Sequence, residues 1–393
     1  MTLALPPALD ARLRTWRHHL HRIPEVAFTE HKTSAYVAAA LTELGFEVAT
    51  GIGGTGVLGS LTRGTSRRAV GLRCELDGLP IWEESGLEYA STHPGTMHAC
   101  GHDGHMAMLL GTAAVLAEDG GFDGTVRVIF QPAEEPGRGA RAMLDDGLLE
   151  RFPLDSVFGL HNQPGVPAGH LHTRPGPVMA SEDNFVVSVT GRGGHASAPH
   201  LVVDPLVIAA EIVLALQHVV ARSVDPVATA VLSCTDVRTD GGRNAIPSNV
   251  RITGDTRSFD PAVQTLLERR IREISAGIAS AHGASAEITY TYEFAPTVND
   301  ADCVTSAARA AVTALGGARV DAEADPITAS EDFGVLAQHV PACLAFLGNG
   351  VTPGRGGTPL HSHDYAFNDD VLAAGVAYYV QVVRDRLAAV DHG

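Results

Sequence analysis

The sequence predicts an α/β fold with a mixed central sheet in a layered domain, interrupted by a ferredoxin-like α+β domain. In the first third of the chain, short apolar runs alternate with segments of helical periodicity, as in layered α/β domains. The middle third instead follows the order β-α-β-β-α-β. The last part returns to helical segments around one apolar strand, so we expect it to complete the first domain.

The first part of the chain is predicted to supply helices and buried strands in alternation. Apolar side chains recur at helical spacing in residues 8–20, 31–44 and 104–118. Short apolar runs with β-branched residues, bounded by Gly or Pro, predict buried strands at residues 69–76, 125–131 and 156–160. This alternation favours a mostly parallel or mixed sheet covered by helices.

The middle segment is predicted to be a domain of its own. Its expected strands are residues 185–190, 228–236, 249–256 and 284–293, and its expected helices are residues 204–220 and 261–282. This order completes a split βαβ unit within about 110 residues, a normal size for a small domain. We therefore predict an inserted domain at residues 181–293. Residues 1–180 and 294–393 would form the other domain, with late helices at 301–315 and 370–390 and a strand at 343–347.

Composition excludes several classes of protein. With 28 Lys and Arg against 45 Asp and Glu, the formal net charge is −17, and no basic patch is visible, so we expect neither nucleic acid nor membrane as a partner. The five cysteines are scattered without a C-x-x-C pair, which favours a reducing, cytoplasmic location. The most apolar window, residues 202–220, contains two acidic residues and a proline, so it is expected to be a buried amphipathic helix.

The densest cluster of reactive side chains lies at residues 97–105, which read MHACGHDGH. Three histidines, a cysteine and an aspartate within nine positions, with glycine at two of them, can fold around one point. Thiolate and imidazole ligands suit borderline-soft divalent ions such as zinc. A solvent-exposed histidine-rich loop is the alternative interpretation.

Two adjacent carboxylates, Glu134 and Glu135, follow the strand expected at residues 125–131. Open α/β sheets place their ligand crevices at such strand ends. Because like charges this close repel each other, a cation or a proton between them is expected. One carboxylate could bind a metal while the other takes a proton from water, although an ordinary acidic turn before a helix fits equally well. His161 and His361 also follow apolar segments in this way.

Taken together, these motifs resemble those of the aminoacylase and carboxypeptidase superfamily of metal-dependent hydrolases. The resemblance is greatest to its hippurate hydrolase and indoleacetyl-amino-acid hydrolase branch, which acts on N-acyl amino acids, and it covers nearly the whole chain. Further matching motifs are HRIPE at 21–25, DGLP at 77–80, GLHN at 159–162, GGHAS at 193–197, NAIP at 244–247, SEDF at 330–333 and HSHD at 361–364. One departure is Glu75, which stands where the family usually has aspartate.

The resemblance implies a metal-dependent amidohydrolase that cleaves the amide bond of hippurate-like or N-acetyl amino acids by a metal-activated water. The residues implied to hold two divalent ions, of zinc, manganese, cobalt or nickel, are Cys100, His102, Glu135, His161 and His361. Glu134 would be the general base. His195 would be catalytic by stabilising the oxyanion, and the implied substrate-binding residues are His195, Asn244 and Arg257, with a structural salt bridge as the alternative for Arg257.

The resemblance further implies that the inserted domain is a lid and a dimerisation domain, so that the enzyme would be a homodimer acting on a small-molecule N-acyl amino acid. A dipeptidase or deacetylase of the same superfamily is a close alternative. A metal-independent cysteine hydrolase that uses Cys100 as nucleophile is a second, and a non-enzymatic metal-binding protein is a third.

Overall fold

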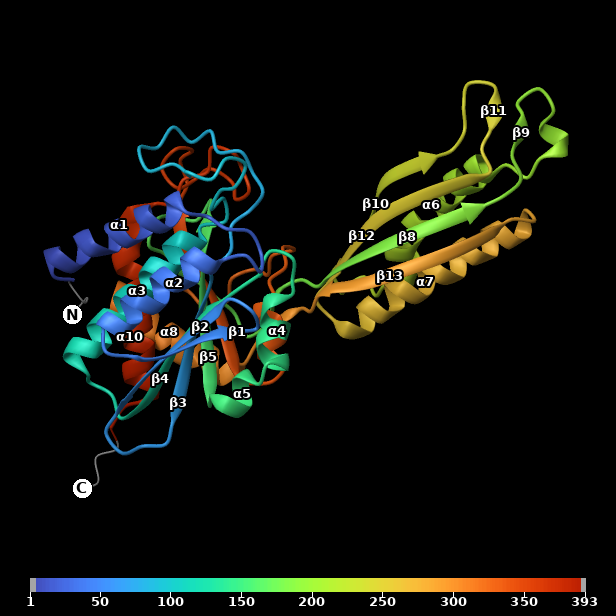
Figure 1. The fold of residues 1–393 in the computed structure, drawn as a ribbon. Coiled ribbons are helices and arrows are strands. Elements are labelled where there is room, and N and C mark those ends of the chain that lie inside the picture. The colour runs from blue at the N-terminus through green and yellow to red at the C-terminus, as the bar shows by residue number, and fades with distance from the viewer. Residues whose placement is uncertain (1–4, 390–393) are drawn as a thin grey trace. The chain divides into compact units, whose positions relative to one another are not determined.

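The computed structural model describes residues 5–389, and these form two compact units (Figure 1). The first unit comprises the described residues up to Val178, the segment Val298–Asp325 and the described residues from Asp332 onward; the second comprises Met179–Thr297 and Pro326–Glu331. The sequence analysis placed the boundaries after residues 180 and 293 and did not assign Pro326–Glu331 to the inserted domain. That assignment depends on long-range bonds such as Ala180 N–H to Ile327 O, 3.2 Å, which no local pattern encodes.

The first unit contains an eight-stranded mixed sheet in the order β1-β2-β4-β3-β5-β16-β6-β15. Its strands are β1 (Glu47–Ile52), β2 (Gly56–Arg63), β3 (Ala69–Glu75), β4 (Gly124–Gln131), β5 (Ser156–Pro164), β6 (Leu171–His172), β15 (Val320–Asp321) and β16 (Ala342–Gly350). Strands β4, β3, β5 and β16 are neighbours and run parallel. The predicted mixed central sheet is confirmed, and the four strands that the sequence analysis identified are these four parallel ones. The shorter or more exposed strands were not predicted.

Helices cover both faces of this sheet (Figure 1). On one side of the sheet lie α1 (Pro7–Arg22), α2 (His31–Glu43), α3 (His102–Asp119), α8 (Ala301–Leu315) and α10 (Leu372–Arg386). Of these, α1 packs against α3 and α10. The other carries the short helices α4 (Gly139–Asp145), α5 (Leu148–Arg151) and α9 (Phe333–Ala337). Two 3₁₀ turns adjoin the longer helices: η2 (Gly317–Arg319) contacts α8, and η3 (Asp369–Val371) contacts α10. Helix α10 ends at Arg386, before the predicted end at residue 390, which lies outside the described residues.

Helix α3 is central, because nearly all of its side chains are buried. It is apolar around most of its circumference, as expected for a helix enclosed between a sheet and the helices α1 and α10. It begins at His102, two residues before the predicted start, directly after Gly101 at φ 92°. A side chain at Gly101 would meet the Asn162 amide oxygen at 2.4 Å, so only glycine allows the chain to enter the helix here.

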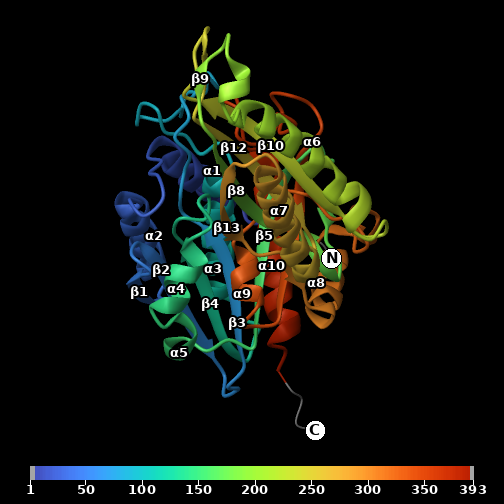
Figure 2. The same ribbon diagram turned by 90° about the vertical axis from the view of Figure 1, so that its right-hand side faces the viewer.

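The second unit is an antiparallel sheet in the order β10-β12-β8-β13, with two helices packed against it (Figure 2). Its main elements are β8 (Glu182–Thr190), α6 (Pro205–Ser223), β10 (Ala230–Thr239), β12 (Asn249–Ser258), α7 (Pro261–Ala281) and β13 (Ser285–Phe294). Both helices begin with an Asp-Pro pair: the Asp204 and Asp260 side chains accept hydrogen bonds from the N–H two residues later. The predicted ferredoxin-like order is confirmed.

Several smaller elements complete the chain. In the second unit, β9 (Gly194–His195) pairs with β11 (Ala245–Ile246), next to the 3₁₀ turn η1 (Pro199–Leu201). The strands β7 (Gly176–Met179) and β14 (Thr297–Asn299) lie where the chain passes from one unit to the other.

In the part of the chain that the structure describes, one helix, α6, is long and apolar enough to cross a membrane. One of its faces packs into the core of the second unit through Ile208, Ile212 and Leu216. The opposite face exposes Val207 and Leu214. The helix that was expected to be buried and amphipathic therefore has one buried face and one exposed apolar face. The structure describes a single chain, so the expected homodimer stays a prediction.

A carboxylate, Asp183, lies fully buried in the second unit. It accepts hydrogen bonds from Gln264 Nε2 at 2.7 Å, the Tyr290 hydroxyl at 2.9 Å and the Thr256 hydroxyl at 3.4 Å. Burial raises the pKa of Asp183 to about 6, and the three hydrogen bonds only partly oppose this. The folded protein therefore keeps this proton at a pH where the unfolded chain has lost it.

We predict that Asp183→Asn removes a pH dependence of stability. The folded-state pKa is raised, so Asp183 favours folding below about pH 4, and this advantage is lost as the pH rises toward 6. The unfolding free energy of the wild type relative to Asp183→Asn should fall by on the order of 2 kcal/mol between pH 4 and 7. Urea unfolding followed by circular dichroism measures it. Asp225→Asn, at an exposed site in the same unit, is the control, and an equal trend for both variants would contradict the assignment.

Candidate functional site

The candidate site lies at one edge of the large sheet, where the parallel strands β3, β4, β5 and β16 end. The carboxyl ends of parallel neighbours meet at the same edge, so the chain segments that follow them converge there. Asp77 follows β3, Glu134 and Glu135 follow β4, His161 lies near the end of β5, and the loop after β16 leads to His361. Cys100 and His102 arrive from the loop that starts α3.

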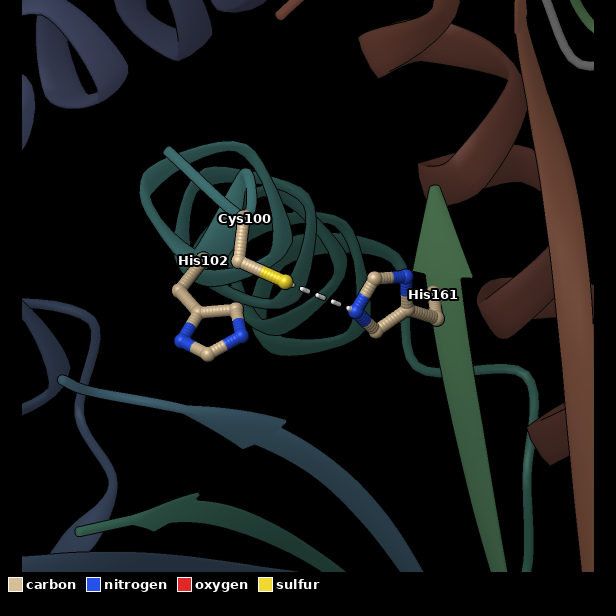
Figure 3. Close-up of side chains that lie close together, drawn as sticks. All are labelled: Cys100, His102 and His161. Carbon is tan, nitrogen blue, oxygen red and sulfur yellow. Dashed lines mark hydrogen bonds between the residues drawn. The ribbon is translucent and has the colours of Figure 1, made fainter. Parts of the chain in front are cut away.

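The structure brings all five expected metal ligands and the expected general base together. Their ligand atoms form overlapping groups, within each of which every atom lies within 4.8 Å of the others. These groups are Cys100 with His102 and His161, Cys100 with Glu135 and His361, and His102 with Glu134 and Glu135. Figure 3 shows the first group, in which Cys100 Sγ lies 3.5 Å from His161 Nε2. The nearest approach of His361 Nε2 to Glu135 Oε2 is 3.6 Å.

The two buried histidines among the expected ligands, His102 and His161, both turn Nε2 toward this group of ligand atoms. His102 Nδ1 donates to the Asp77 carbonyl oxygen at 2.8 Å, and His161 Nδ1 donates to the Asn162 carbonyl oxygen at 2.8 Å. Such outer bonds orient a metal-binding imidazole and leave Nε2 facing the metal. His102 Nε2 is buried and has no hydrogen-bond partner among residues 5–389. A buried nitrogen without a partner is costly unless a cation occupies the space in front of it, so this donor set fits a metal ion.

Burial and neighbouring charges shift the pKa values of the candidate ligands. Burial, together with the charge of Glu135, raises the pKa of the Cys100 thiol to about 12, and burial lowers the pKa of His161 to about 3. Burial opposes an imidazolium at His102, but the adjacent Cys100 and Asp77 outweigh it and raise the pKa of that ring. A metal ion would displace the protons of Cys100 and His102, because it binds thiolate and unprotonated imidazole.

Asp77 links the two halves of the site. Its backbone oxygen orients His102, while its carboxylate oxygen Oδ2 accepts a hydrogen bond from the Glu135 N–H at 3.0 Å. The sequence analysis quoted Asp77 only as part of a matching motif. From its position after β3, Asp77 thus fixes both the His102 ring and the backbone of Glu135.

The turn that carries Glu134 is braced by Asp332. The Asp332 N–H donates to Glu134 Oε1 at 3.3 Å. Its carboxylate accepts hydrogen bonds from the Ala140 N–H at 2.8 Å and from Gln131 Nε2 at 2.7 Å, on either side of the turn. The sequence analysis quoted residues 330–333 as a motif but assigned no role to Asp332.

His361 is held by its backbone. It has φ 64°, a left-handed conformation that is unusual for a residue with a side chain, and its N–H donates to the Ala99 carbonyl oxygen at 2.9 Å. Ala99 precedes Cys100, so this bond ties the loop after β16 to the loop before α3. The His361 side chain is 52% exposed, which places it on the solvent side of the site.

A second layer of buried polar groups lies behind the ligands, and the sequence analysis gave these residues no role. His105 Nδ1 lies 2.6 Å from Glu75 Oε2, and His105 Nε2 accepts a hydrogen bond from the Asn162 N–H at 3.0 Å. Glu75 also pairs with the buried guanidinium of Arg73. The sequence signal that could have revealed this layer was the density of polar residues within 97–105. In the structure, the histidines of this loop and Asp103 are buried. A solvent-exposed histidine loop is therefore excluded.

A further buried cluster surrounds Asp103, next to His102. Asp103 pairs with Arg17 at 3.0 Å and with His21 Nδ1 at 2.9 Å, and His21 Nε2 lies 3.1 Å from Glu83. Burial opposes the charge on His21, but Asp103 and Glu83 outweigh it and raise the pKa of His21 to about 9. This cluster anchors helix α1 and the Glu83 loop to the start of α3.

The remaining predicted residues belong to the second unit. His195 lies on β9 opposite Ala245, next to Asn244, whose backbone oxygen accepts a hydrogen bond from Ala196. The Ser197 N–H donates to His195 Nδ1 at 3.1 Å, so the proton of a neutral ring is on Nε2, where it can be donated. Both His195 and Asn244 are exposed.

Arg257, in contrast, already has partners within its own unit. It pairs with Glu182 at 2.7 Å and with Asp255 at 3.0 Å, and it donates to the Ser330 hydroxyl at 2.7 Å. This is the arrangement of a structural salt bridge, the alternative considered above. Its role in substrate binding stays a prediction.

Comparison with known proteins agrees with this geometry. Residues 71–385 match the model of peptidase family M20/M25/M40. The chain is 39% identical to hippurate hydrolase of Campylobacter jejuni over 96% of this chain and 98% of that protein. It is 37% identical to N-acetyl-L-cysteine deacetylase of Bacillus subtilis over 86% and 81% of the two chains. The crystal structure of the YXEP protein of Bacillus subtilis, a dinuclear metal-binding peptidase from the M20 family, superposes with a TM-score of 0.84 at 30% identity and covers 98% of this chain and 100% of that one.

We predict that divalent metal stabilises the fold through Cys100. Relative to chelated protein, saturating zinc or manganese should raise the thermal unfolding midpoint of the wild type by roughly 5 °C or more, because the metal binds only the folded site. In Cys100→Ser the rise should be less than half as large, since a hydroxyl is a poorer ligand than a thiolate. Cys234→Ser, at a half-buried thiol in the second unit, is the control and should retain the full rise. Equal shifts in all three proteins would exclude Cys100 as a ligand.

Proposed function

Because the chain belongs to peptidase family M20/M25/M40, we propose that it hydrolyses the amide bond of N-acyl amino acids and releases a carboxylic acid and a free amino acid. The family makes it a metallo-amidohydrolase with a small substrate. The proposed substrate class, hippurate-like or N-acetyl amino acids, is supported by the similarity to hippurate hydrolase over nearly the full length of both chains.

The observation that carries the proposal is that two adjacent carboxylates, a thiol and three imidazoles converge at the carboxyl ends of the parallel strands. We propose that Cys100, His102, Glu135, His161 and His361 would hold two divalent ions, of zinc, manganese, cobalt or nickel. When bound, such ions lower the pKa of water and polarise a carbonyl oxygen.

In this reaction Glu134 acts as the general base. Its carboxylate takes a proton from the attacking water and passes it to the amine nitrogen as the amide bond breaks. The Asp332 N–H, 3.3 Å from Oε1, orients the carboxylate for this transfer. A position beside Glu135 keeps Glu134 within reach of the metal site, while its neighbour supplies the ligand.

His195 is proposed to stabilise the oxyanion that forms on the amide carbonyl. The support is its tautomer, because Nδ1 is occupied by Ser197 and Nε2 is left to donate a hydrogen bond. Asn244, adjacent to the same short ladder, and Arg257 are proposed to bind the substrate carboxylate.

A deacetylase or dipeptidase of the same family remains the alternative function, and similarity to N-acetyl-L-cysteine deacetylase supports it. The cysteine-hydrolase alternative is disfavoured, because it leaves Glu134, Glu135 and His361 without a role and because burial raises rather than lowers the pKa of Cys100. The alternative of a non-enzymatic metal-binding protein is disfavoured, because the chain belongs to a family of peptidases.

We predict that chelation abolishes turnover of hippurate and N-acetyl-methionine and that added divalent metal restores it. Initial rates should be measured on a panel of N-acyl amino acids and on dipeptides with a free amine. Rates at least tenfold higher on N-acyl substrates are expected. Faster cleavage of the free-amine dipeptides would instead establish a dipeptidase, and turnover that survives chelation but not thiol alkylation would establish the cysteine hydrolase.

We predict different outcomes for the two adjacent carboxylates. Glu134→Gln should keep the metal content of the wild type and lose at least about 100-fold in kcat, because the general base is absent. Glu135→Gln should lose metal as well as activity. Metal analysis and steady-state kinetics on the same samples separate these outcomes. Substantial activity in metal-loaded Glu134→Gln would refute its assignment as the base.

A further inference from the structure

A buried carboxylate outside the expected site, Glu30, contacts two residues of unusual backbone conformation. Among residues 5–389, three residues other than glycine have a positive φ: Phe28 at 61°, Ala133 at 48° and His361 at 64°. The N–H groups of Phe28 and Ala133 both donate to Glu30 Oε1, at 3.0 and 2.9 Å. One carboxylate oxygen thus binds two of the three left-handed residues.

Ala133 immediately precedes Glu134 and Glu135. A left-handed conformation is unfavourable for alanine and persists only where the surroundings impose it. The Ala133 carbonyl oxygen accepts a hydrogen bond from the Gly139 N–H at 2.9 Å, which closes the turn. A side chain at Gly139 would lie 1.6 Å from the Pro132 carbonyl oxygen, so the closed turn has no room for one.

Glu30 is itself firmly held. It has no exposed surface, and its second oxygen, Oε2, accepts a hydrogen bond from the Thr55 hydroxyl at 2.5 Å. Burying a carboxylate is costly, and an apolar side chain would fill this position at lower cost. The carboxylate accepts hydrogen bonds from the Thr55 hydroxyl and from the N–H groups of Phe28 and Ala133. An apolar side chain could not make these bonds, so the carboxylate's contribution is to hold the backbones of Phe28 and Ala133 in place.

We propose that Glu30 is a positioning residue: by holding Ala133 in the left-handed conformation, it sets the direction in which Glu134 and Glu135 leave strand β4. This inference rests on the proposed roles of Glu134 as base and Glu135 as ligand. A change of φ at Ala133 would displace both carboxylates, and displacements of about 1 Å at a reacting group can cost on the order of 100-fold in rate. Glu30 acts from the start of α2 and does not touch the substrate.

A purely structural role for Glu30, at the start of α2, makes a different prediction. Glu25 provides the matched control, because its carboxylate accepts hydrogen bonds from the N–H groups of Lys32 and Thr33, at 2.8 and 3.0 Å, in the first turn of the same helix. Glu25→Ala therefore removes support from α2 while leaving the bond to Ala133 in place.

The experiment compares Glu30→Ala, Glu30→Gln and Glu25→Ala in the full-length, metal-loaded enzyme. The measurements are kcat and KM on the best N-acyl substrate, zinc affinity by chelator competition, and the thermal midpoint. Glu30→Ala should lower kcat 30- to 100-fold with KM within threefold, and should weaken zinc binding about tenfold through Glu135. Glu30→Gln, whose amide oxygen can still accept from both N–H groups, should stay within threefold of the wild type in kcat and in zinc affinity. Glu25→Ala should lower the midpoint but leave kcat and zinc affinity within twofold.

A second variant tests the backbone mechanism. Glycine adopts the left-handed conformation without strain, so Ala133→Gly introduced into Glu30→Ala should recover at least fivefold in kcat. A Glu30→Ala enzyme that loses thermal stability but keeps wild-type kcat and zinc affinity would overturn the proposal, as would a Glu25→Ala enzyme with the same kinetic loss. If the wild type turned over no substrate on the panel, the proposed function would fail, and the zinc affinities would still decide the role of Glu30.

Discussion

The site depends on one constraint: most of the polar side chains that converge at the ends of four parallel strands are buried, so they need hydrogen-bond or ion-pair partners or a bound cation. The fully buried guanidinium of Arg73 lies at the centre of this arrangement. It donates to Gln131 at 2.9 Å and to Asp332 at 2.7 Å, and it pairs with Glu75. These bonds tie β3 to the end of β4 and to the start of α9. Removing the charge of Arg73 would leave the buried carboxylates of Glu75 and Asp332 without their cationic partner, which is costly.

The same constraint explains where the backbone is strained. Of the left-handed residues that are not glycine, Ala133 and His361 carry or adjoin groups of the candidate site, and each is tied by its N–H to another segment. Strain of this kind survives only where several interactions determine the conformation together. The surrounding helices and the buried carboxylates Glu30 and Asp332 provide that support. Hydrogen bonds to other segments thereby fix the turns that carry Glu135 and His361, a condition for placing reacting groups precisely.

The second unit has a core of its own and follows a different logic. Its antiparallel strands alternate buried and exposed side chains, and α6 and α7 cover one face. His195 lies on an exposed two-stranded ladder and Asn244 directly precedes its second strand, without the dense packing that surrounds Cys100 and His102. Groups in such a position suit a role that is completed only when substrate is bound, in agreement with the role proposed for His195.

The sequence by itself determined the main helices and strands and the types of residue that meet at the candidate site. Short continuous apolar runs predicted the four parallel strands, because strands covered on both faces bury every side chain. Helical and strand periodicity predicted the split βαβ order, because core-facing side chains repeat at the period of their own helix or strand. The motifs around Cys100, Glu135 and His161 likewise predicted which residue types meet at the strand ends. Only the tertiary structure decided which groups support them. Glu30 binds Ala133, Asp332 binds Glu134, and Pro326–Glu331 joins the second unit. All three are contacts between residues far apart in the chain. Such contacts leave no local periodicity, because they depend on how separate segments pack and on which buried polar groups then lack a partner.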